Sequence, residues 1–112
     1  MGCVLLTPEE IRFELTQVGR ELYKAADAIQ QLEVEAERAE LLAQSEMDKV
    51  YLTAEGSIED RKALARERAV EARDKAVIAR ASYNRARAKA KGLELQQMRL
   101  MATLKSIQLE GA

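Results

Sequence analysis

Glu55-Gly56-Ser57 is the one strong interruption between two long helical stretches of this 112-residue sequence. Gly56 suits the left-handed position that commonly ends a helix, and Ser57 is a good N-cap for the helix that follows. Asp60, three residues after Ser57, is a weaker partner for a capping box. A joint as short as residues 55–57 predicts that the two stretches fold back on one another in antiparallel fashion.

The start of the first stretch carries equally clear signals. Thr7 is a good N-cap, Pro8 fits the first helical position, and Glu10 completes a capping box. Leu6 and Ile11 occupy the two positions of a hydrophobic staple. The sequence therefore predicts a single domain over residues 1–112, with one helix over about 8–54 and a second over about 58–109.

Apolar residues recur in both stretches at alternating spacings of four and three, the heptad pattern of a left-handed coiled coil. In the first stretch this seam comprises Ile11, Leu15, Val18, Leu22, Ala25, Ile29, Leu32, Ala36, Ala39 and Ala43. In the second it comprises Ala65, Ala69, Ala72, Ala76, Ala79, Tyr83, Ala86, Ala90, Leu93, Gln97, Leu100, Leu104 and Ile107. After Ala43 the row shifts to Met47, Val50 and Ala54, because Glu46 holds the expected position. The pattern predicts an all-α fold in which two long helices form an antiparallel coiled-coil hairpin.

Charge favours the same arrangement. Residues 8–55 carry twelve acidic and five basic residues, a net of −7, whereas residues 58–110 carry thirteen basic and seven acidic residues, a net of +6. Folding at Gly56 brings opposite charges together on the two flanks of the seam, where they set the register more than the stability. The predicted ion pairs are Glu33 with Arg80, Glu40 with Arg73, and Glu35 with Lys75.

Large apolar residues also lie outside the seam, where two paired helices leave them in water. Exposed patches of this kind usually mark an interface. An alanine-rich seam is also a weak driving force, because it buries little apolar surface. We therefore expect a homo-oligomer, most simply a dimer that forms a helical bundle. The candidate interface residues are Val70, Val77, Ile78, Leu95 and Met98.

The composition disfavours catalysis and metal chemistry. There is no His, and the single Cys3 precedes the first helix, so Ser-His and Cys-His pairs are excluded. No Gly-rich phosphate loop occurs. We expect no enzyme activity, no metal and no cofactor. Met1-Gly-Cys3 begins like a lipid-acceptor sequence, but Leu6 stands where that motif wants Ser or Thr.

The membrane is not an expected partner, because no apolar run approaches the roughly 18 residues that span a bilayer. A lone cysteine fits a reducing cytoplasm. We therefore expect a cytoplasmic protein.

The second stretch contains a basic segment that is open to two interpretations. Seven basic residues and one acid lie between Arg73 and Lys91. A basic stripe of this kind can follow a phosphate backbone, and it can equally serve ion pairs within the hairpin. The candidate nucleic-acid-binding residues are Arg80, Arg85, Arg87, Lys89 and Lys91.

The segment Tyr51-Leu-Thr-Ala-Glu-Gly-Ser-Ile-Glu-Asp-Arg61-Lys-Ala-Leu-Ala65, together with Leu6-Thr-Pro-Glu-Glu-Ile11, resembles small helical proteins encoded by bacteriophages, particularly those of actinobacteria. Such proteins often lie among replication and recombination genes. The resemblance implies an accessory protein that acts in the host cytoplasm with a protein partner, such as a recombinase, or with single-stranded DNA. It supplies no catalytic residues. The alternative is a structural or adaptor protein, such as a virion component, with no nucleic-acid role.

Overall fold

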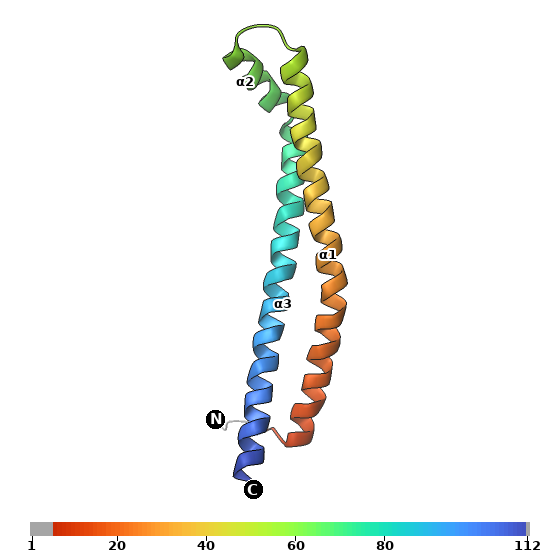
Figure 1. Cartoon of the computed structure of the whole chain (residues 1–112), viewed down its shortest axis with the longest axis vertical. Helices are drawn as coiled ribbons and strands as arrows, with labels where there is room; N and C mark the ends of the chain where they lie inside the picture. Colours follow the sequence, from red (N-terminus) through yellow and green to blue (C-terminus); the bar gives the residue numbers. More distant parts are fainter. Residues whose placement is uncertain (1–5, 112) are drawn as a thin grey trace. The chain divides into compact units, whose positions relative to one another are not determined.

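The computed structural model describes residues 6–111, and this part of the chain contains three α-helices and no strand. They are α1 (Pro8–Thr53), α2 (Ile58–Arg68) and α3 (Val70–Glu110) (Figure 1). The chain divides into two compact units. The first unit joins the N-terminal stretch up to Ala28 with the stretch from Ala86 onward, and the second unit is Ile29–Arg85. The all-α prediction is confirmed for the described residues.

The first turn of α1 has the cap that its sequence predicts. The Thr7 hydroxyl accepts a hydrogen bond from the backbone N–H of Glu10 at 3.2 Å. The N–H of Ile11 donates to the carbonyl of Thr7 at 3.0 Å. Leu6 packs against the cluster that contains Ile11, as a hydrophobic staple requires. The hydroxyl of Thr7 thus satisfies an N–H group that the helix cannot satisfy by itself, and the carbonyl of Thr7 accepts the first backbone hydrogen bond of the helix.

The joint between α1 and α2 also has the conformation that its residue types predict. Gly56 has a φ of 110°, a value that side chains with a Cβ rarely adopt. The Ser57 hydroxyl accepts from the N–H of Asp60 at 3.1 Å and caps α2. The predicted glycine turn and serine cap are confirmed, and α1 ends at Thr53.

The second helical stretch is divided, whereas the sequence predicts one helix over about residues 58–109. The break lies at Ala69, whose φ of −94° and ψ of 4° are those of a turn. Hydrogen bonds from Ala69 to Ala65 and from Arg73 to Ala69 continue across it, at 3.0 and 2.9 Å. Figure 1 shows α2 running obliquely to α3. Because no Gly or Pro lies at the break and Ala69 is fully buried, packing rather than local propensity explains the bend.

The first unit has a core of large aliphatic side chains. Here the N-terminal part of α1 and the C-terminal part of α3 run in opposite directions (Figure 1). Ile11, Val18 and Leu100 are buried. Partly buried residues surround them: Leu6, Leu15, Leu22, Leu93, Leu104 and Ile107.

The second unit is built differently, since its buried residues are mostly alanines. They are Ala36, Ala43, Ala65, Ala69, Ala76 and Tyr83. Every buried residue of both units belongs to the predicted seam, so the seam is confirmed. Met47, Val50 and Ala54 are half-buried while Glu46 is exposed, which confirms the shift of the row after Ala43.

The predicted register of the second unit is wrong by one heptad. Arg80 pairs with Glu40, not with Glu33, and so Glu40 does not pair with Arg73. Near the joint, however, Arg61 contacts Tyr51. Tyr51 lies 11 residues after Glu40, whereas Arg80 lies 19 residues after Arg61. The oblique course of α2 accounts for the eight additional residues in the second arm. Because α2 is inclined, it advances along α1 by less than a helix of the same length that ran parallel to α1.

The predicted pair of Glu35 with Lys75 is also wrong. The ammonium group of Lys75 lies 3.6 Å from a carboxylate oxygen of Glu71, one turn earlier on α3. This is an exposed pair four residues apart on one helix, so it adds little to the joining of the two arms.

Candidate interaction surfaces

The strongest polar contact between α1 and α3 lies on one flank of the second unit. Arg80 donates two hydrogen bonds to the carboxylate of Glu40, one of them from Nε at 3.0 Å. The Arg80 guanidinium also lies 5.2 Å from the centre of the Tyr83 ring. Two parallel bonds from a planar guanidinium to a carboxylate fix orientation as well as distance.

This contact shifts the pKa of both partners. The hydrogen bonds from Arg80 lower the pKa of Glu40 below its ordinary value of 4.5, and the charge of Arg80 acts in the same direction against partial desolvation. The same hydrogen bonds raise the pKa of Arg80. Of the predicted nucleic-acid-binding residues, Arg80 is therefore already engaged within the chain.

The other basic candidates are exposed. Arg85 belongs to the second unit, and Arg87, Lys89 and Lys91 belong to the first. Their exposure leaves these side chains accessible to solvent, and the structure places each of them on α3.

Arg61 is a structural residue that the sequence does not single out. Its Nε and Nη2 donate to the carbonyl of Tyr51 at 3.0 and 2.8 Å, and its guanidinium lies 4.4 Å from the centre of the Tyr51 ring. Tyr51 lies in the last turn of α1, where backbone carbonyls lack helical partners and favour a cation. A basic residue close in sequence to a helix C-terminus is a signal for such a clasp, because its side chain can hydrogen-bond the last carbonyls of the helix.

The predicted interface residues are all exposed. Val70, Val77 and Ile78 lie on the second unit, and Leu95 and Met98 lie on the first. α1 adds further exposed apolar side chains in each unit. They are Phe13 and Tyr23 in the first unit, and Val34, Leu41, Leu42 and Leu52 in the second.

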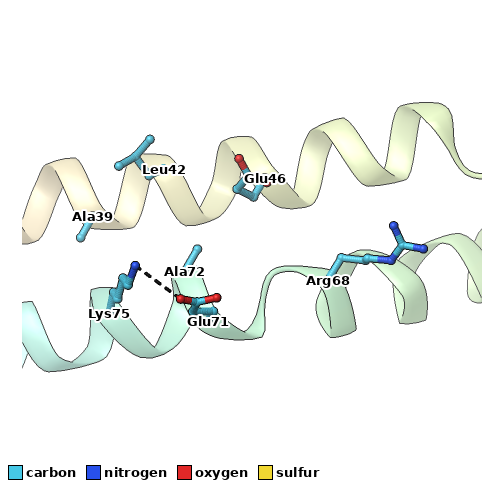
Figure 2. Close-up of a pocket in the computed structure, with 7 residues that line it drawn as sticks. All are labelled: Ala39, Leu42, Glu46, Arg68, Glu71, Ala72 and Lys75. Atoms are coloured by element: carbon cyan, nitrogen blue, oxygen red, sulfur yellow. Dashed lines mark ion pairs between the residues drawn. The ribbon is translucent and has the colours of Figure 1, made fainter.

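A groove of about 350 Å³ opens between α1 and the α2–α3 break in the second unit (Figure 2). Ala39 and Ala72 point into the space between the helices from opposite sides, and Leu42 lies beside them. Four charged residues complete the lining: Glu46, Arg68, Glu71 and Lys75. The groove thus combines a floor of small apolar side chains with a rim of both signs of charge.

Metal sites and membrane spans can be sought only among the residues that the structure describes. Residues 6–111 contain no cluster of three or more His, Cys, Asp or Glu side chains placed to hold a metal ion. No helix of this range combines the length and the hydropathy needed to cross a bilayer. Gly2 and Cys3, which begin the lipid-acceptor-like sequence, lie outside the described residues.

Comparison with known proteins finds no family model, no curated protein and no solved structure that matches the chain. A functional assignment therefore depends on the side chains of the chain itself.

Proposed function

We propose that the chain is a coiled-coil association protein: an antiparallel helical hairpin that assembles into a helical bundle, holds a protein partner and carries out no chemistry of its own. The observation that carries this proposal is the exposure of large apolar side chains in both units. Among the described residues, fourteen such side chains are exposed, whereas Ile11, Val18, Tyr83 and Leu100 are the large apolar side chains that are buried.

The buried alanines and the exposed large apolar side chains both contribute little to the stability of the single chain. Burial of apolar surface stabilises by about 25 cal/mol per Å², so alanines contribute little and exposed leucines contribute nothing until a second surface covers them. Soluble monomers rarely expose contiguous apolar patches of more than a few hundred Å². Association would bury side chains that the chain alone leaves in water.

The experiment is a measurement of mass against concentration. Light scattering and sedimentation should give a dimer or a larger assembly at micromolar concentration, with dissociation on dilution. The melting temperature should rise with protein concentration, because mass action favours the associated folded state. A chain that stays monomeric at all concentrations, with a constant melting temperature, would contradict the proposal.

A second candidate function is binding of single-stranded DNA. Exposed Lys89 and Lys91 on α3 favour it, since basic side chains that reach solvent bind phosphates and release counterions. Anisotropy with labelled single-stranded DNA should show binding that weakens as salt is raised. The double variant Lys89→Glu/Lys91→Glu should lose this binding. The matched control Arg99→Glu/Lys105→Glu makes the same change in charge on exposed residues of α3 and should retain more of it.

The biological setting that we propose follows the resemblance of the joint and the N-terminal segment to bacteriophage proteins. In that setting the chain is a phage-encoded accessory protein of DNA recombination or replication in the host cytoplasm, and a recombinase is the kind of protein it would hold. Absence of DNA binding at low salt would favour the alternative of a structural or adaptor protein.

A further inference from the structure

The groove beside the α2–α3 break is shaped to receive a side chain. Its floor is formed by Ala39 and Ala72, whose small side chains leave room between the helices. Leu42 lies beside this floor and is 58% exposed, so the same surface offers both a depression and a large apolar side chain. A surface that presents a hole and a knob together can interlock with a copy of itself.

The charges around the groove favour a second copy over a partner of one charge sign. Glu46 and Glu71 face solvent together with Arg68 and Lys75, so the rim carries two charges of each sign. A strongly acidic or strongly basic partner would meet two like charges. A two-fold interface joins one patch to the same patch, and it therefore requires a surface that is complementary to itself.

The order of these residues along the groove fits such an interface. In Figure 2, Lys75 lies across from Leu42 toward one end and Arg68 lies at the other, with Ala72 and Glu46 between them. A two-fold axis near Ala72 would reverse this order in the second copy. Lys75 of each copy would then face Glu46 of the other, twice per dimer.

We infer that two copies of the chain associate groove to groove through the second unit. Leu42 of each copy packs beside Ala72 of the other, and the pair of Lys75 with Glu46 is formed twice. This inference rests on the proposed self-association and specifies which surface forms it and with what symmetry.

The first experiment compares two neighbouring leucines. Leu42→Glu places a charge at the centre of the interface and should raise the dissociation constant of the dimer by about tenfold or more. Leu41→Glu is the matched control, because Leu41 is 71% exposed but does not line the groove, and it should leave the dissociation constant nearly unchanged. Circular dichroism at concentrations where both variants are monomeric should show equal helix content.

The second experiment exploits the two-fold symmetry. Lys75→Glu alone sets two carboxylates against each other at each of the two contacts, and Glu46→Lys alone sets two ammonium groups against each other there. Each variant should therefore self-associate more weakly than the wild type. In an equal mixture of the two variants, each chain meets opposite charges on the other, and a heterodimer should form. A purely intramolecular role of Lys75, such as its pair with Glu71, would give no such rescue by a second chain.

The outcomes separate this inference from the proposed function. If the wild-type chain associates but Leu42→Glu has no effect, or Leu41→Glu weakens association equally, the groove is not the interface although self-association stands. If mixing the charge variants gives no heterodimer, the two-fold pairing is wrong. A wild-type chain that never associates overturns both proposals.

Discussion

The two units of this chain share one heptad pattern but differ in what the pattern buries. In the first unit the seam encloses Ile11, Val18 and Leu100, so removal of large apolar surface from water stabilises it. In the second unit the buried residues are alanines and Tyr83, and the directional contacts of Arg61 and Arg80 supplement the seam. Periodicity thus defines which residues of each helix face the seam, whereas side-chain volume decides how strongly the two helices hold together.

The largest effect should come from the aliphatic core of the first unit. Ile11 is fully buried, so Ile11→Ala should lower the free energy of unfolding by about 2–4 kcal/mol through lost burial and the cavity left behind. Phe13→Ala is the control, because Phe13 is 65% exposed and its removal should change stability by less than about 0.5 kcal/mol in the dissociated chain. Urea denaturation followed by circular dichroism measures both. Equal losses for the two variants would show that the first unit has no distinct core.

The second unit should respond to added volume instead. Ala36 is fully buried between helices, so Ala36→Leu should destabilise by about 1–3 kcal/mol through overpacking. Ala81→Leu, at an exposed position of α3, adds the same atoms without a clash and is the matched control. Denaturation midpoints of the two variants give the comparison. If Ala36→Leu stabilised the protein, the alanine seam would be loosely packed and the contrast between the units would fail.

Two glycines, one in each unit, should change stability in opposite directions. Gly56→Ala forces a Cβ into a left-handed conformation and should cost about 1–2 kcal/mol. An added Cβ would lie 3.4 Å from Asp60, an ordinary contact, so the cost comes from the backbone.

Gly19 lies inside α1, and nothing stands within 4 Å of an added Cβ. Gly19→Ala should therefore stabilise by about 0.5–1 kcal/mol. In thermal unfolding, the melting temperature of Gly56→Ala should lie below that of the wild type and the melting temperature of Gly19→Ala should lie above it. Two changes of melting temperature with the same sign would contradict this reasoning.

The smallest effect concerns the pH dependence of the Glu40–Arg80 pair. Because folding lowers the pKa of Glu40, its contribution is fully present above the unfolded value, near 4.5, and is lost as the pH falls through the folded value. The melting temperature of Glu40→Gln should therefore lie below that of the wild type at neutral pH and approach it in acid. Glu67→Gln, at an exposed position of α2, is the control and should show a smaller difference at neutral pH. A gap that persists at low pH would indicate a loss of packing rather than of charge.

Much of the fold could be predicted because its signals are local or periodic. The Thr7 and Ser57 caps and the positive φ of Gly56 each follow from a residue type at a fixed offset. The seam follows from a repeat that extends over both arms, so errors at single positions do not disturb it. These features require no knowledge of how far one arm slides along the other.

The register of the two arms could not be predicted, because the signal that defines the seam is itself repetitive. A heptad repeat looks identical after a shift of seven residues, and Arg73 and Arg80 occupy equivalent positions on the same flank of the seam. Counting outward from Gly56 favours Glu40 with Arg73, whereas the bend at Ala69 brings Glu40 to Arg80. No Gly, Pro or cap marks Ala69, so this bend depends on packing between arms that the sequence alone does not weigh.

The groove could not be predicted from the sequence either. Its lining comes from three separate elements and depends on the same bend, so the spacing of residues along the chain does not predict that a groove opens there. The predicted interface residues Val70, Val77 and Ile78 are exposed as expected, whereas the role that we propose for Leu42 depends on its neighbours across the groove.

The clasp of Arg61 on Tyr51 bears on the order in which the second unit forms. It joins residues only ten apart, whereas the Glu40–Arg80 contact joins residues forty apart. The entropic cost of closing a loop grows with its length, so the corner closes at the lowest cost and later contacts extend from it. A chain arranged in this way is expected to zip from the turn toward its ends, with its folding nucleus at Arg61 rather than in its most apolar core.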